Sequence, residues 1–148
     1  MRRSIAAALL FASLALACAK GVPAEFHGVK LGMQPGDVRA RFDLPSGHWK
    51  NDGGTSTVGG GALKLTWKRD AGGDGPEEAV FEFHNGLLVA IRARYAVGTH
   101  DAFAMGTSRL ETSSTVLARD DEGGKKNVRW IAKDCPDHEA EVRSILGK

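Results

Sequence analysis

The feature that most constrains the fold of this 148-residue chain is the segment AVFEFHNGLLVAIRARYA, residues 79–96. Two runs of alternating apolar residues flank Asn85 and Gly86 in this segment. Alternation with a period of two is typical of a β-strand that is buried on one face. Asn-Gly between two such runs is a strong short-range signal for a β-hairpin. The segment therefore predicts two antiparallel strands joined by a tight turn.

The register of this hairpin depends on which side chains must share a face. A two-residue loop would divide the apolar side chains of the two strands between opposite faces of the sheet. A three-residue loop over residues 84–86 instead pairs Phe83 with Leu87 and Phe81 with Val89, all on one side. We therefore expect the three-residue loop.

Further strand and helix patterns surround the hairpin. Residues 62–69 alternate like a half-buried strand, and residues 114–134 indicate a second hairpin that turns around Glu122 and two glycines. The segments expected to be helical are one of about two turns from Pro35, one over 99–111, and a final one that Pro136 opens, with Val142, Ile145 and Leu146 on one side.

The glycine-rich segment NDGGTSTVGGGALK, residues 51–64, invites comparison with a phosphate-binding loop. A P-loop needs a Lys and a Ser or Thr directly after its last glycine, whereas Gly61 is followed by Ala62 and Leu63. We therefore expect a mobile surface loop here.

The order of these elements predicts the fold class. Neighbouring antiparallel strands with separate helices are typical of an α+β two-layer domain, in which helices pack on one face of an antiparallel sheet. A chain of this size has room for one core. Residues 26–148 are therefore expected to form a single domain.

The N-terminal residues have the layout of a secretory signal peptide. Arg2 and Arg3 precede an apolar run, residues 5–17, that ends in small residues. The run is too short to cross a bilayer, which takes roughly 20 apolar residues. We expect residues 1–17 to be a signal peptide.

Cys18 stands where the apolar run stops, and three fates stay open for it. A lipoprotein peptidase would make Cys18 the acylated first residue, with residues 18–25 as a tether to the membrane. An ordinary signal peptidase could cleave after Ala17 or after Ala19, because both positions meet the small-x-small rule, and cleavage after Ala19 would discard Cys18 with the leader. Cleavage after Ala17 would leave an unmodified Cys18 that could pair with Cys135, the other cysteine of the chain, in an oxidising compartment. We expect lipidation.

Charge argues against nucleic acid as a partner. The chain has 20 basic and 18 acidic residues, and loss of Arg2 and Arg3 with the leader would make the two counts equal. Binding of nucleic acid requires a clustered excess of Lys and Arg.

The segment VKLGMQPGDVRARFDLP, residues 29–45, resembles the GMT-x-x-x-V helix motif of the SmpA/OmlA family of small bacterial envelope lipoproteins, and FEFHNGLLVAI, residues 81–91, is similar to the aromatic-rich hairpin of that family. The family includes an accessory subunit of the machinery that assembles outer-membrane β-barrels. The resemblance implies a β-lactamase-inhibitor-protein-like fold and a protein partner. It also implies a structural role for the matching residues, which are Gly32, Met33, Val38, Pro45, Asn85 and Gly86.

Few residues suggest a catalytic or metal-binding site. Cys135 and His138 are three apart at a helix start, but a structural zinc site takes four ligands and the other histidines lack ligand spacing. A Cys-His nucleophile pair needs a third, orienting group that spacing cannot show. We therefore assign no catalytic residue, metal or cofactor. Trp49, at the start of a polar loop, is the aromatic residue most expected to contact a partner.

The sequence thus predicts a non-enzymatic bacterial envelope protein. It would be an outer-membrane lipoprotein facing the periplasm, anchored through Cys18, and would bind an unidentified envelope protein as a binding or assembly module. Two alternatives stay open: a small exported hydrolase or redox protein that uses Cys135 and His138, and a soluble periplasmic or secreted ligand-binding protein.

Overall fold

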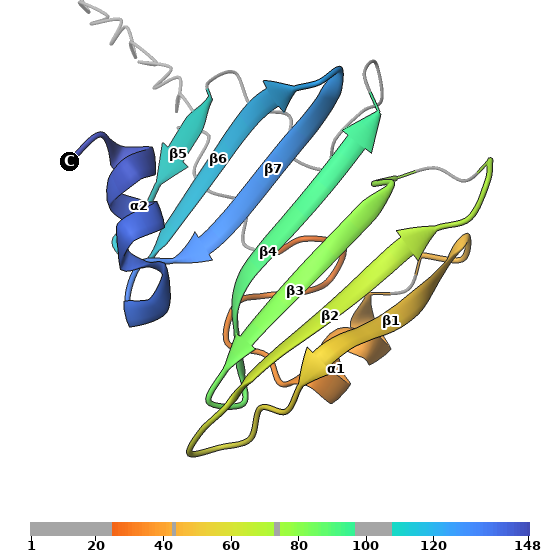
Figure 1. Cartoon of the computed structure of the whole chain (residues 1–148), viewed down its shortest axis with the longest axis horizontal. Coiled ribbons are helices and arrows are strands. Elements are labelled where there is room, and N and C mark those ends of the chain that lie inside the picture. Colours follow the sequence, from red (N-terminus) through yellow and green to blue (C-terminus); the bar gives the residue numbers. More distant parts are fainter. Residues whose placement is uncertain (1–24, 43, 73–74, 97–107) are drawn as a thin grey trace, which may run out of the picture.

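A computed structural model describes residues 25–42, 44–72, 75–96 and 108–148 of the chain. In these ranges seven strands form one antiparallel sheet in the order β1-β2-β3-β4-β7-β6-β5 (Figure 1). The strands are β1 (Gly47–Gly54), β2 (Ala62–Arg69), β3 (Glu78–His84), β4 (Leu87–Ala96), β5 (Arg109–Glu111), β6 (Thr115–Glu122) and β7 (Lys125–Ala132). The helices are α1 (Pro35–Arg41), the 3₁₀ turn η1 (Pro136–His138) and α2 (Glu139–Leu146). The described chain is therefore a sheet-dominated fold with two short helices.

The turn of the central hairpin, β3–β4, has two residues, so the predicted three-residue loop is wrong. His84 pairs directly with Leu87 across the turn. Asn85 and Gly86 have φ values of 52° and 82°. Positive φ at both central positions defines a type I′ turn, for which Asn-Gly is the preferred sequence.

A β-bulge explains how a two-residue turn still keeps the apolar side chains on one face. The register shifts between Glu82 and Phe83, so that Phe83 pairs with Leu88 while Phe81 pairs with Ile91. The extra residue in β4 reverses which face of the sheet each later side chain of β4 points to. The bulge thus keeps the apolar side chains of both strands on one face, which the predicted three-residue loop would also have done.

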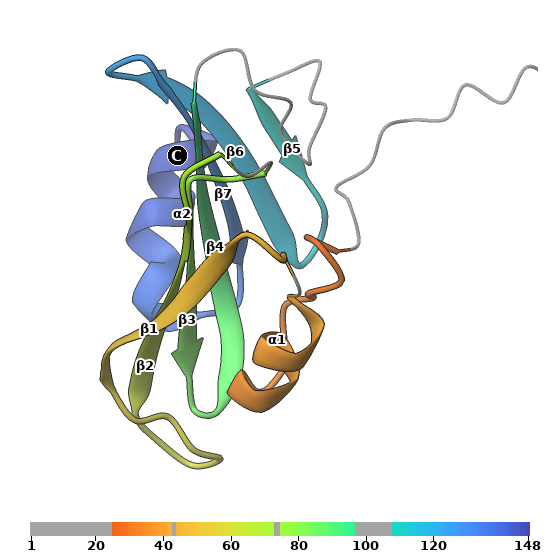
Figure 2. The same ribbon diagram turned by 90° about the vertical axis from the view of Figure 1, so that its right-hand side faces the viewer.

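Helix α1 covers one face of the sheet, which we call the α1 face (Figure 2). The main core lies on this face. Helix α1 packs there through Val38 and Phe42, and the Phe42 ring lies 5.0 Å from Phe81 and 5.4 Å from Trp67, between ring centroids. The strand residues buried on this face include Leu65, Trp67, Phe81, Phe83, Ile91, Val128 and Trp130.

Helix α1 forms where the sequence predicts it. Pro35 occupies the first turn, where its missing N–H has no intrahelical partner to lose, and Asp37 lies at the positive end of the helix dipole. Val38 is the residue that this short helix buries.

The opposite face, which we call the α2 face, carries helix α2 (Figure 2). The prediction that the helices pack on one face is therefore wrong. Alternation along β7 sends Trp130 to the α1 face and Ile131 to the other, where Ile131 and Ala90 contact Val142 of α2. The predicted apolar side of the final helix is confirmed, since Ile145 and Leu146 pack against the same cluster.

The first residues of the predicted loop over 51–64 belong instead to the edge strand β1, which ends at Gly54. Its sequence, GHWKNDGG, shows no alternation, so β1 depends on pairing with β2 rather than on its own pattern. Gly47 is required where the strands meet, because a Cβ there would lie 2.1 Å from the ring of Trp67.

The C-terminal half agrees with the sequence in its hairpin and differs in the segment before it. Strands β6 and β7 pair through Glu122 and Lys125 across two glycines, as expected. Strand β5 occupies 109–111, the end of the segment predicted as a helix, and residues 97–107 lie outside the described residues. Within the described ranges, no helix has the length and apolar character needed to cross a membrane.

Candidate functional site

Four of the residues that match the family motif lie around α1. The Gly32 N–H donates to the Leu88 carbonyl, and the Leu88 N–H donates to the Met33 carbonyl, both at 2.8 Å. Val38 is buried in the core, and Pro45 is exposed in the turn before β1. Gly32 and Met33 thus attach the segment before α1 to the start of β4.

The other two motif residues form the tip of the central hairpin. The Asn85 N–H donates to the Gly61 carbonyl at 3.0 Å, and the Gly86 N–H donates to Ser56 Oγ at 2.7 Å. A Cβ at Gly86 would lie 2.9 Å from the backbone nitrogen of Val58. The tip is therefore held by part of the glycine-rich segment.

The residues expected to contact a partner or a membrane are placed differently. Trp49 lies in β1, is half-buried, and packs on Phe42 and Phe81 at 5.7 and 5.4 Å between ring centroids. Most of the surface of Trp49 therefore packs against the core. Cys18 lies outside the described residues.

The structure brings together three side chains that suit metal binding or proton transfer: His84, Cys135 and His138. One ligand atom from each lies within 4.8 Å of the other two. The distance from His84 Nδ1 to Cys135 Sγ is 3.2 Å. The two imidazole rings stack nearly parallel, 7° apart, with their centroids separated by 5.3 Å. We call these three residues the His-Cys cluster.

Local structure explains why the cluster forms. His84 is the last residue of β3, on the α2 face, while Cys135 and His138 bracket η1. The His138 N–H donates to the Cys135 carbonyl at 3.1 Å, which folds the two side chains into one turn. Pro136 fixes the start of that turn.

Three carboxylates surround the cluster. Asp137 Oδ2 lies 2.8 Å from His84 Nδ1. On the other histidine, Glu82 Oε2 lies 3.3 Å from His138 Nε2, and Glu141 Oε2 lies 3.5 Å from His138 Nδ1. His138 therefore has a carboxylate on each ring nitrogen.

The cluster is largely shielded from solvent. Cys135 and His138 are 6% and 7% exposed, and Cys135 forms no disulfide within the described part of the chain. His138 Nε2 is buried without a hydrogen bond of acceptable geometry there, despite its proximity to Glu82. Buried polar atoms are normally hydrogen-bonded, so each exception calls for an explanation.

The cluster does not match the geometry of a Cys-His-Asp triad. In a triad, the thiol and the orienting carboxylate bind opposite nitrogens of the histidine ring. Here Cys135 Sγ and Asp137 Oδ2 both meet Nδ1 of His84. The thiol and the carboxylate thus converge on one nitrogen of His84 instead of binding its two sides.

A charge network extends from the cluster along the α2 face. Arg92 donates two hydrogen bonds of 2.6 Å to Glu141 and one of 3.1 Å to Glu82. Arg129 donates to Glu141 at 3.2 Å. The bonds from Arg92 and Arg129, chiefly those from Arg92, lower the pKa of Glu141 to about 2. The bonds to Glu141 and Glu82 raise the pKa of Arg92 further above its ordinary value.

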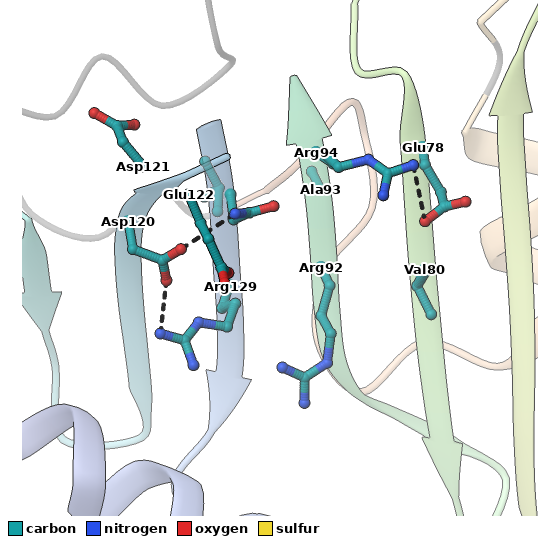
Figure 3. A pocket seen from close by; sticks show the side chains of 11 residues that line it. Glu78, Val80, Arg92, Ala93, Arg94, Asp120, Asp121, Glu122 and Arg129 are labelled. Carbon is teal, nitrogen blue, oxygen red and sulfur yellow. Dashed lines mark hydrogen bonds and ion pairs between the residues drawn. The ribbon is translucent and has the colours of Figure 1, made fainter. Parts of the chain in front are cut away.

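The network ends at a hollow of about 580 Å³ on the same face, between β3, β4, β6 and β7 (Figure 3). Its walls carry charges of both signs: Arg94 lies 3.7 Å from Glu78, and Arg129 donates to Asp120 at 2.8 Å. Asp121 belongs to the same wall and is largely exposed. The volume is in the range of small-ligand pockets, but the walls are more polar than in most of them.

Sequence reasoning missed the contribution of His84 to the cluster. Cys135 and His138 are close in sequence, but His84 is 51 residues from Cys135. The alternation in β3 could have placed His84 on the polar face with Glu82. The approach of His84 to Cys135 depends on how the chain runs from the end of β7 into η1. No local sequence pattern predicts that path.

Comparisons with known proteins add no assignment. No protein-family model matches the chain, and no curated protein or solved structure matches it significantly. The resemblance to the SmpA/OmlA family therefore stays a prediction.

Proposed function

We propose that this chain is a non-enzymatic bacterial envelope protein, lipidated at Cys18, whose sheet domain binds another envelope protein as a binding or assembly module. The leader-like residues 1–17 and the cysteine that follows them support export and anchoring. The resemblance to SmpA/OmlA lipoproteins supports the same role.

The observation that carries the proposal is the hollow on the α2 face. Arg94, Glu78 and Asp120 present charges of both signs along its walls, with Asp121 exposed at its edge. Protein interfaces combine such polar contacts with shape complementarity. A charged segment of a partner fits these walls better than an apolar small molecule does.

The proposed tether is compatible with this role. Residues 18–24 precede the described part of the chain, which begins at Glu25, and an extended chain covers about 3.4 Å per residue. The domain could therefore reach roughly 25 Å from a lipid at Cys18. This reach keeps the partner within the envelope.

Site-specific photo-cross-linking in native envelopes tests the binding surface. A photoreactive amino acid at Asp121, in the hollow, should capture one discrete partner, whereas the same group at exposed Lys50 on β1 should not. Charge reversal by Arg94→Glu should abolish the capture, and Lys50→Glu should leave it intact. Capture that survives Arg94→Glu, or that occurs equally from position 50, would exclude the hollow as the binding surface.

Metabolic labelling with radioactive palmitate tests the anchor. Wild-type protein should incorporate label and Cys18→Ser should not, because acylation requires the thiol. Equal label in both would rule out a lipid at Cys18, and the cross-linking result would then be interpreted for an unanchored protein.

A further inference from the structure

We propose that His84, Cys135 and His138 form a binding site for a transition-metal ion of the zinc class. This inference goes beyond protein binding and does not depend on it. The proposal rests on the convergence of three side chains from separate parts of the chain, on the carboxylates that hold them, and on their burial.

The spacing of the ligand atoms is close to that of a tetrahedral site. Zn–S bonds of about 2.3 Å and Zn–N bonds of about 2.0 Å at a tetrahedral angle separate sulfur from nitrogen by roughly 3.5 Å. His84 Nδ1 and Cys135 Sγ are 3.2 Å apart, and all three ligand atoms lie within 4.8 Å of one another. Small side-chain rotations suffice to place them around one ion.

The ligand types select the class of metal. A thiolate with two imidazoles suits Zn²⁺ and other borderline or soft ions, whereas Mg²⁺ and Ca²⁺ require oxygen ligands. Asp137, whose Oδ2 lies 2.8 Å from His84 Nδ1 on the exposed side of the cluster, is placed to supply an oxygen ligand. The site would then be closed by Asp137 or left open to solvent at its fourth position.

The surrounding carboxylates support a metal site in a second way. Metal-binding histidines commonly direct their other ring nitrogen to a carboxylate, which fixes the ring and raises its basicity. Glu141, 3.5 Å from His138 Nδ1, has this place when His138 binds the ion through Nε2, and Glu82 lies 3.3 Å from that Nε2. Both are themselves held by Arg92, so the position of the His138 ring is set before an ion arrives. An ion bound by the His138 ring would also account for its buried nitrogen that lacks a hydrogen bond.

Metal binding would fasten the C-terminal segment to the sheet. His84 ends β3, while Cys135 and His138 begin the segment that leads into α2. The apolar contacts between α2 and the sheet are few, centred on Val142. An ion shared by the two segments would stabilise the folded state by an amount that rises with the logarithm of the ion concentration relative to its dissociation constant.

Titration of the purified full chain, reduced and freed of metal by a chelator, tests the proposal with Co²⁺ and Zn²⁺ as the probes. One equivalent of Co²⁺ should give a thiolate-to-cobalt charge-transfer band that Zn²⁺ abolishes. Cys135→Ser should remove the band, and His84→Ala should weaken Zn²⁺ binding by more than about tenfold. His48→Ala, at an exposed histidine of β1, and Cys18→Ser, at the other cysteine, are the matched controls and should keep both signals.

Measurements on the wild type keep the proposal testable if a variant does not fold. Saturating Zn²⁺ should raise Tm by about 5 °C or more and should slow alkylation of Cys135. An unchanged Tm together with an unchanged alkylation rate would overturn the proposal, as would full Zn²⁺ affinity in a folded Cys135→Ser protein.

Discussion

The α1 face and the α2 face of the sheet bury different kinds of side chain. On the α1 face, Phe42, Phe81 and Trp67 pack ring against ring within a large apolar core. On the α2 face, the apolar cluster is small and a charge network around Arg92 lies beside it. One sheet thus carries a large apolar core on one face and a small apolar cluster beside a charge network on the other.

The difference follows from alternation along single strands. In β3, Phe81 and Phe83 point to the α1 face, while Glu82 and His84 point to the other. The proposed metal site and the proposed protein-binding hollow both use the polar set. Substitutions one residue apart in β3 therefore test the main core and the two proposed sites separately.

Truncation of a ring on the α1 face should have the largest effect. Phe81 is fully buried and contacts Phe26, Phe42 and Trp49, so Phe81→Ala should lower the free energy of unfolding by about 3–5 kcal/mol. Denaturant unfolding measures this loss. Leu87→Ala, at a side chain that is 44% exposed, is the control and should cost less than about 0.5 kcal/mol. Similar losses in the two variants would contradict the assignment of the main core to the α1 face.

The charge network on the α2 face should appear as acid sensitivity. Folding lowers the pKa of Glu141 from 4.5 to about 2, chiefly through Arg92 and with a smaller effect of Arg129. The stabilisation is therefore complete above pH 4.5 and is lost as the pH falls toward 2. Its size is on the order of 2 kcal/mol, because the side chain is 23% exposed and solvent screens part of the interaction.

Glu141→Gln should remove this part of the pH dependence. Unfolding free energies at pH 5 and pH 3, measured with a chelator present, should differ less in the variant than in the wild type. Glu139→Gln is the control, because Glu139 lies at an exposed position of the same helix. An unchanged slope in Glu141→Gln would mean that Arg92 does not hold this carboxylate in solution.

Much of this arrangement could be predicted from local sequence. The strand over 62–69, the second hairpin, the helix at Pro35 and the apolar side of the last helix all follow from periodicity and from proline position. These elements carry their own signal because each buries one face or begins with a residue of restricted φ.

The errors have physical causes that lie outside any local pattern. A bulge at Val89 in β4, opposite Glu82 and Phe83, compensated for the short turn. A bulge leaves no distinctive pattern in a run of alternating residues. Strand β1 has a sequence that forms a strand only when β2 supplies its partners. The His-Cys cluster required the approach of His84 to Cys135, which the tertiary fold alone determines.

A matched pair of valines compares the two helices directly. Val38 of α1 and Val142 of α2 are both buried, and each is the apolar anchor of its helix. Val38→Ala should cost about 2 kcal/mol, because the surrounding rings are packed too tightly to close the cavity. Val142→Ala should cost about 1 kcal/mol, because its neighbours are few and can relax. Equal losses by denaturant unfolding would mean that the α2 face contributes as much packing as the α1 face.

The smallest expected effect concerns a histidine, His27, that packs against the aromatic rings of the α1 face. His27 lies 4.7 Å from Phe26 and 5.7 Å from Phe42 between ring centroids, and burial lowers the pKa of His27 below its ordinary value of 6.5. The folded state therefore favours the neutral ring. Its contribution is complete above pH 6.5 and is lost as the pH falls through the lowered pKa.

His27→Asn should flatten the stability profile just below pH 6.5 and leave the acid loss below pH 4.5 unchanged, because Glu141 causes that loss on the other face. Asparagine suits this position, since His27 has a φ of 46° and Asn tolerates the left-handed region. His48→Asn, at an exposed histidine, should leave the profile as it is. If His27→Asn also changed the slope below pH 4.5, the two faces would be coupled through the sheet rather than independent.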